Sequence, residues 1–103
     1  MSYRIDIAEP AEHDLWDIAK YISYQLNAPT TAIKMIQAIK AAIAKLETMA
    51  ISYPLVRDDR LAALGYRMIT VKNYIAFYRA NEEEKTVVVD RILYGRRDWR
   101  NLL

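Results

Sequence analysis

Several residue types that often carry chemistry are absent or scarce in this chain of 103 residues. It has no cysteine, which excludes a disulfide framework and a cysteine-ligated metal site and suits a reducing compartment. The only histidine, His13, lies between two acidic residues and has no second histidine to complete a metal site. The two glycines, Gly65 and Gly95, form no glycine-rich phosphate loop. We therefore expect neither a metal nor a cofactor.

Long uninterrupted apolar stretches are also missing. The N-terminus carries Arg4, Asp6 and Glu9 and has no apolar signal-peptide core. Three lysines and a glutamate interrupt the richest apolar region, residues 32–51, which is therefore unsuited to span a membrane. The apolar content of 53% is nevertheless enough for one modest core. These features predict a single domain over residues 1–103 that is cytoplasmic and makes no membrane contact.

Charge is unevenly distributed although the formal net charge is only +2. Residues 1–56 hold five Lys/Arg and six Asp/Glu, whereas residues 57–103 hold ten and seven. In residues 91–103 all four basic residues are arginines, which suit bidentate contacts with carboxylate or phosphate. An anionic partner at this end is expected, but a nonspecific nucleic-acid binder is usually more basic.

The first half of the chain predicts one strand and two helices. Alternation over residues 3–7 indicates a half-buried strand, and Pro10 suits the first turn of a helix. Apolar residues then recur at helical spacing from Leu15 to Leu26. After a break at residues 27–29, a second helix is expected from about Thr30 to Met49, folding back as an antiparallel hairpin.

The second half predicts a three-stranded meander. Residues 51–64 are expected to be a connecting loop, and strands follow at about 66–71, 74–80 and 86–94. Lys72 and Asn73 form the first turn, where asparagine tolerates a positive φ, and residues 81–85 form the second. The predicted class is α+β: an N-terminal strand, an antiparallel two-helix hairpin, a three-stranded antiparallel meander forming one sheet, and a short C-terminal helical tail.

Both faces of the predicted strands carry apolar residues. Strict alternation places Val89, Arg91 and Leu93 on one face and Val88, Asp90 and Ile92 on the other. The helical hairpin covers only one face, so the other face is either a binding surface or is covered by residues 51–64 or the C-terminal segment.

The arginines of these strands allow two interpretations. Arg67, Arg79, Arg91, Arg96 and Arg97 would hold a phosphate near Tyr78, Tyr94 and Trp99 if the protein cleaved RNA. Alternatively, they pair with carboxylates of Asp90, Asp98 or a partner, which we prefer because a general acid and base are not evident.

Three segments resemble the RelE/ParE superfamily of bacterial toxin–antitoxin toxins. They are Gly65-Tyr66-Arg67, residues 73–79 (NYIAFYR) and residues 91–98 (RILYGRRD), and Pro10 to Ile18 is similar to the first helix of that family. The likeness covers essentially the whole chain. It implies a growth-arresting toxin that a cognate antitoxin neutralises by wrapping a helix and a strand around it, and a homodimer when the antitoxin is absent.

The superfamily has two activities, and the resemblance leans toward one. RelE-like members cleave mRNA on the ribosome, whereas ParE-like members inhibit DNA gyrase. Arg67 and Arg97 match basic positions of the RelE pattern, but Ile69 and Ile75 stand where it has charged residues, and Leu103 lies near its C-terminal tyrosine. The Tyr-Gly-Arg-Arg-Asp ending favours the ParE branch. A nuclease and a degenerate, non-toxic member that binds only its antitoxin are the alternatives.

The resemblance and the residue pattern together imply three sets of site residues. A nuclease would use Arg67, Arg97, Tyr78 and Tyr94. The target would contact Arg67, Arg79, Arg91, Arg96, Arg97 and Trp99, with Phe77, Tyr78 and Tyr94 as further anchors. The antitoxin would contact Ile75, Phe77, Arg79, Arg91 and Leu93.

Overall fold

The order of elements agrees with the order that the sequence predicts. The computed structural model describes residues 2–103. Its elements are β1 (Arg4–Ile7), α1 (Glu9–Lys20), the π-helical turn η1 (Tyr21–Gln25), α2 (Pro29–Ala44), α3 (Leu46–Met49), α4 (Asp59–Ala63), β2 (Arg67–Val71), β3 (Tyr74–Asn81), β4 (Thr86–Tyr94) and the 3-10 turn η2 (Trp99–Asn101). The α+β class and the short C-terminal helical tail are confirmed.

The four strands form one sheet in the order β1-β4-β3-β2. The meander β2-β3-β4 is antiparallel, as predicted, and β1 adds to its β4 edge in parallel. The helices connect β1 to the meander, which supplies the long crossover that a parallel pair needs. The sheet is therefore mixed rather than wholly antiparallel.

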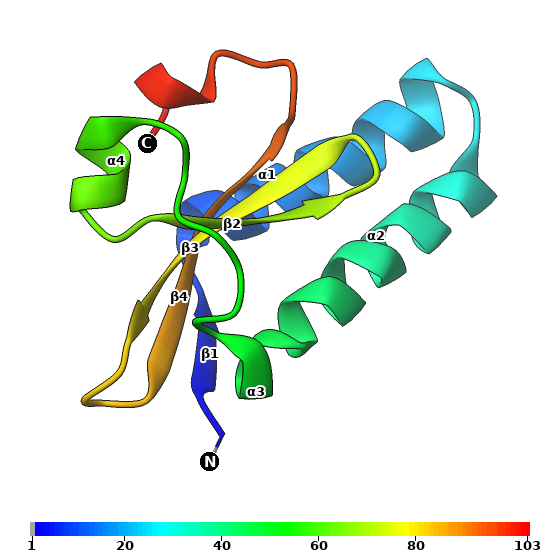
Figure 1. The fold of residues 1–103 in the computed structure, drawn as a ribbon. Coiled ribbons are helices and arrows are strands. Elements are labelled where there is room, and N and C mark those ends of the chain that lie inside the picture. The colour runs from blue at the N-terminus through cyan, green and yellow to red at the C-terminus, as the bar shows by residue number, and fades with distance from the viewer. Residues whose placement is uncertain (1) are drawn as a thin grey trace.

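The helical hairpin lies across one face of the sheet (Figure 1). Pro10 lies in the first turn of α1, where its missing N–H costs no hydrogen bond. The last turn before the hairpin bend is π-helical, and Asn27 adopts φ 52° at the bend. The second helix is interrupted after Ala44, so the single helix expected to reach Met49 is two helices, α2 and α3. None of the helices within residues 2–103 is long and apolar enough to cross a membrane.

The main core lies between the hairpin and the sheet. Ile39, Ile43 and Leu46 from the second half of the hairpin pack in one buried cluster with Val87 and Val89 of β4. The helical spacing of the apolar residues places these side chains on one stripe, which is the stripe that faces the sheet. This layer confirms the predicted packing of the hairpin on one face.

A second, smaller core lies on the opposite face of the sheet. Residues 54–66, which include α4, and the C-terminal tail lie over this face, where α4 and the end of the chain are side by side (Figure 1). Asp58 caps α4 by accepting the Leu61 N–H at 3.1 Å. Arg60 donates to the Arg100 carbonyl at 2.8 Å. The chain itself therefore covers this face, and part of the expected 51–64 loop is a helix.

A β-bulge changes the side-chain alternation of β4. Phe77 pairs with Arg91 and Tyr78 pairs with Val89, so the backbone of Asp90 has no opposite residue in the β3–β4 ladder. One extra residue reverses the alternation beyond it. Val89 therefore shares the main core with Ile92, while Leu93 belongs to the second core. The strict alternation expected over residues 88–93 is wrong for this reason.

The β2–β3 turn falls at Lys72 and Asn73 as predicted, but the residue with the left-handed backbone is not the expected one. Lys72, not Asn73, adopts a positive φ, at 53°. Gly95, which follows β4, donates its N–H to the Asn73 carbonyl at 2.7 Å. A Cβ atom at residue 95 would approach that carbonyl oxygen to 3.3 Å, so glycine permits the close contact.

Candidate protein-binding site

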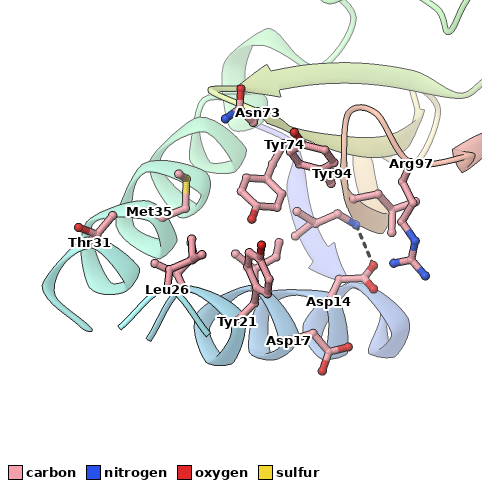
Figure 2. A pocket seen from close by; sticks show the side chains of 14 residues that line it. Asp14, Asp17, Tyr21, Leu26, Thr31, Met35, Asn73, Tyr74, Tyr94 and Arg97 are labelled. Atoms are coloured by element: carbon pink, nitrogen blue, oxygen red, sulfur yellow. Dashed lines mark hydrogen bonds between the residues drawn. The ribbon is translucent and has the colours of Figure 1, made fainter. Parts of the chain in front are cut away.

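An open groove of about 630 Å³ lies where the helical hairpin passes the ends of β3 and β4 (Figure 2). One wall comes from α1 and η1, a second from α2, and the third from the strand ends. The lining residues are Asp14, Asp17, Ile18, Tyr21, Ile22, Leu26, Thr31, Met35, Asn73, Tyr74, Ile92, Leu93, Tyr94 and Arg97. The groove is mostly apolar and has charged groups only from α1 and from Arg97.

Three tyrosines dominate the groove. Tyr74 and Tyr94 contact edge to face, with ring centroids 5.9 Å apart and an interplanar angle of 70°. Burial raises the pKa of Tyr74, and the neighbouring Tyr21 and Tyr94 hydroxyls raise it further. Tyr21, Leu26 and Tyr94 keep roughly half of their surface exposed. Aromatic rings with one apolar and one polar end are the side chains that protein interfaces favour.

A buried ion pair fixes the inner end of the groove. The Asp14 carboxylate on α1 accepts the Nε and Nη2 hydrogens of Arg91 at 2.7 and 2.9 Å. It also accepts the Ile92 N–H at 2.9 Å, drawn as the dashed line in Figure 2. β1 pairs with β4 only as far as Val89. The carboxylate thus takes the place of a strand partner where β1 has ended.

The other arginines of the expected target surface have different surroundings. Arg67 donates to the Tyr53 carbonyl at 2.7 Å. Arg79 forms a bidentate pair with Asp90 at 2.9 and 3.0 Å and lies over the Tyr66 ring. The hydrogen bonds that Arg79 donates to Asp90 are the main cause that raises the pKa of Arg79, and those that Arg91 donates to Asp14 raise the pKa of Arg91. The guanidinium groups of Arg67, Arg79 and Arg91 are therefore engaged within the chain.

Arg96 and Arg97 are the two expected target-binding arginines whose side chains make no ion pair or hydrogen bond within residues 2–103. They are adjacent in sequence but line different hollows. Arg97 lies at the rim of the groove near Asp14 (Figure 2). Arg96 lines a smaller recess beside Lys72. The structure therefore separates these two cations.

The apolar residues expected at the antitoxin and target surfaces lie inside the protein. Ile75, Phe77 and Leu93 are buried in the second core, and Trp99 packs on Phe77 with ring centroids 5.2 Å apart. The Tyr78 hydroxyl is buried and donates to the Ala50 carbonyl at 2.7 Å. Burial raises the pKa of Tyr78 to about 12, so this group is a poor proton donor and has no open path to a substrate.

The sequence did not single out the groove-lining Tyr21, Tyr74 and Met35. Tyr21 and Met35 lie on helices and Tyr74 on a strand, so no sequence motif joins them. The one available signal is Tyr21, an aromatic residue beside the apolar stripe of the first helix. Leu26, which we expected in that buried stripe, is 56% exposed because the π-helical turn rotates the end of the helix.

Solved structures that share this fold include two toxin–antitoxin systems. The chromosomal ParDE toxin–antitoxin system of P. aeruginosa matches with a TM-score of 0.74 and 21% identity, over 90% of this chain and 96% of the other. The RelBE2 toxin–antitoxin complex of Mycobacterium tuberculosis matches with a TM-score of 0.64 and 18% identity, over 91% and 99%. At these identities the likeness establishes the fold.

The family is established from the sequence. A comparison with curated proteins finds no match. The family model described as the ParE toxin of the type II toxin–antitoxin system parDE matches residues 5–99, which is nearly the whole chain. The resemblance to the RelE/ParE superfamily is thereby confirmed. This chain belongs to the ParE toxin family of type II toxin–antitoxin systems.

Proposed function

We propose that this toxin arrests growth by binding a protein target in the cytoplasm, with DNA gyrase as that target, and not by cleaving RNA. The observation that carries the proposal is the burial of Tyr78. An RNA-cleaving site needs a proton donor and acceptor within reach of the scissile phosphate. The Tyr78 hydroxyl is held by the Ala50 carbonyl inside the main core and has no access to RNA.

Two further positions support binding rather than cleavage. Ile69 lies in the main core and Ile75 in the second core, at positions where the RelE pattern carries charge. Buried isoleucines contribute to folding and supply no group for acid–base chemistry. Arg67, which matches a basic RelE position, is occupied by the Tyr53 carbonyl. In this proposal the exposed Arg96 and Arg97 contact an acidic surface of the target.

We further propose that the groove receives a helix of the cognate antitoxin. Its volume of about 630 Å³ and its tyrosine and aliphatic lining suit the apolar side chains of an amphipathic helix. Both similar structures are described as toxin–antitoxin systems or complexes. This assignment moves the proposed antitoxin contact from Ile75 and Phe77, which lie in the second core, to Tyr21, Tyr74 and Tyr94, and it keeps Leu93, which also lines the groove.

The nuclease is the second candidate because Tyr94 and Arg97 line the same open groove. Tyr94 is 42% exposed, so its hydroxyl has the access to substrate that Tyr78 lacks. A phosphate held by Arg97 would bring a cleavage site to that hydroxyl. The general base would have to be Asp17, the exposed carboxylate of the groove, because Asp14 is held by Arg91 and the Ile92 N–H.

Two assays with the purified toxin separate the candidates. We expect the toxin to inhibit supercoiling of relaxed plasmid by gyrase, and Arg97→Glu to reduce this inhibition at least tenfold. Messages on translating ribosomes should stay intact in the same concentration range. Cuts at defined codon positions would establish the nuclease instead. If neither assay responds and cells expressing the chain without antitoxin grow normally, the chain is a non-toxic member of the family.

A further inference from the structure

We propose that a recess on the β2–β3 side of the molecule binds a phosphate group of a nucleic-acid backbone. The recess has a volume of about 210 Å³ and is lined by Thr70, Lys72, Asn73, Ile75, Tyr94, Gly95 and Arg96. It adjoins the groove, since Asn73 and Tyr94 line both hollows, but Lys72 and Arg96 line only the recess. The proposal does not depend on whether gyrase or the ribosome is the target.

Charge is the first argument. Lys72 and Arg96 come from two different turns and carry positive charge into the same hollow, which no carboxylate lines. In the part of the chain that the structure describes, neither takes part in an ion pair. By contrast, Arg79 and Arg91 in the same sheet each have an aspartate. Two neighbouring cations without a counter-charge repel each other, and an anion shared between them removes that repulsion.

The backbone is the second argument. Lys72 adopts φ 53°, a left-handed conformation that a side chain with a Cβ atom disfavours. Asparagine, which tolerates this conformation, is the next residue, yet the lysine occupies the strained position. Lys85 in the β3–β4 turn adopts the same conformation, at φ 52°, and lines neither hollow, so this backbone fixes the position of Lys72 and does not by itself mark a ligand site. Here the Gly95 N–H bond to the Asn73 carbonyl fastens the two turns together and fixes where Lys72 lies relative to Arg96.

Hydrogen-bond donors and an aromatic ring in the recess are the third argument. Thr70 and Tyr94 add two hydroxyl donors to the ammonium and guanidinium groups of the recess. A phosphodiester presents two non-bridging oxygens, each of which accepts more than one hydrogen bond. Tyr94 also offers an aromatic ring, 42% exposed, on which an adjoining base can stack. A carboxylate has two acceptor oxygens as well, so the Tyr94 ring, and not the hydroxyls, favours a nucleic-acid backbone over a carboxylate.

The test measures binding of a fluorescein-labelled single-stranded DNA of twelve nucleotides to the full chain by fluorescence anisotropy, at two salt concentrations. We expect Lys72→Asn and Arg96→Gln each to weaken binding about three- to tenfold. Each should also lower the slope of log affinity against log salt by about 0.7, the value for one contact to a single strand. Lys72→Asn should raise the melting temperature, since asparagine tolerates the left-handed backbone. A higher melting temperature would show that this variant binds more weakly because it has lost a charge and not because it misfolds.

The matched control is Lys40→Gln, which removes one exposed positive charge from α2, away from the recess. It should leave both the affinity and the salt slope unchanged. An equal loss in Lys40→Gln would mean diffuse attraction to the whole chain and would overturn the proposal, as would undetectable binding at low salt.

A second measurement identifies the anion. Inorganic phosphate, added to the 15N-labelled chain, should shift the amide resonances of Thr70, Asn73 and Gly95, and acetate at the same ionic strength should shift them much less. Equal shifts with acetate would mean a carboxylate site and would overturn the phosphate assignment.

Discussion

Asp14 and Arg91, separated by 77 positions in the sequence, form a bidentate ion pair that joins α1 to β4. The Arg91 guanidinium also donates to the Leu102 carbonyl at 3.3 Å. A single side chain thus connects the helical hairpin, the sheet and the C-terminal tail. Asp14 is the one buried charged residue of the described chain, and each of its buried oxygens has a partner.

Asp14→Asn should destabilise the protein strongly. The change leaves the partly buried Arg91 without a counter-charge, and breaking a buried pair costs about 3–5 kcal/mol. Because Arg91 keeps about a quarter of its side chain exposed, we expect the free energy of unfolding, measured in urea, to fall by about 2–4 kcal/mol. Asp17→Asn, on the exposed side of the same helix, is the control and should cost less than about 0.5 kcal/mol. Similar losses for both variants would contradict this role of Asp14.

Tyr78 should make the protein less stable at alkaline pH. Its pKa rises from 10.0 to about 12 on folding, so between these values the unfolded chain loses the proton and the folded chain keeps it. The free energy of unfolding therefore falls as pH rises from 10 toward 12, by at most about 1.4 kcal/mol per pH unit from this residue. The raised pKa of Tyr74 acts in the same direction.

Tyr78→Phe isolates that contribution. The variant should lose about 1–3 kcal/mol at pH 8, since the buried Ala50 carbonyl has lost its donor. Its stability should then depend less steeply on pH above 10 than that of the unchanged chain. The measurement is urea unfolding at intervals between pH 8 and pH 11. If the stability of the two proteins fell equally with pH, the folded structure would not raise the pKa of Tyr78.

The second core predicts opposite behaviour for the two tryptophans. Trp99 is 9% exposed and packs on Phe77, so Trp99→Ala should cost about 3 kcal/mol and expose the apolar face of the sheet. Trp16 on α1 is 63% exposed, and Trp16→Ala should change stability by less than about 0.5 kcal/mol. Binding of a hydrophobic dye should rise only for Trp99→Ala. If the unchanged chain bound the dye as strongly as Trp99→Ala, this face of the sheet would not be covered.

The groove predicts that two tyrosines of the same π-helical turn differ in antitoxin binding. Tyr21 lines the groove, whereas Tyr24 is 79% exposed and does not. Tyr21→Ala should weaken binding of the cognate antitoxin at least tenfold, as expected for a central aromatic contact, and Tyr24→Ala less than twofold. Isothermal titration calorimetry with the purified cognate antitoxin provides the measurement. Equal effects of the two changes would place the antitoxin elsewhere.

Periodicity predicted those elements that are long enough to show it. The helical hairpin and the meander each repeat apolar residues over several turns or alternations, and both are present. The five-residue helix α4 was expected to be loop, because so short a segment shows no periodicity and depends on the Asp58 cap. The predicted end of the second helix was also wrong, since no residue around Ala44 signals that the helix is interrupted there.

The candidate site was less accessible from the sequence. Apolar side chains on both faces of the sheet were recognised, but sequence alone did not show that residues 54–66 and the tail cover one face. Arg91 was expected to contact a partner, although its aspartate lies on the first helix, far away in the sequence. The groove combines residues of two helices and two strands, and only the fold brings them together.

The β-bulge at Asp90 in β4 has a consequence for the end of the chain. Because this extra residue reverses the alternation, Ile92 faces the hairpin and Leu93 faces the second core. A chain shortened by that one position would present every later strand residue to the opposite side. The bulge residue Asp90 therefore sets which way the last part of β4 faces, and with it the different directions of Arg96 and Arg97. Homologous toxins with and without this insertion should differ in which face of the sheet carries their terminal arginines.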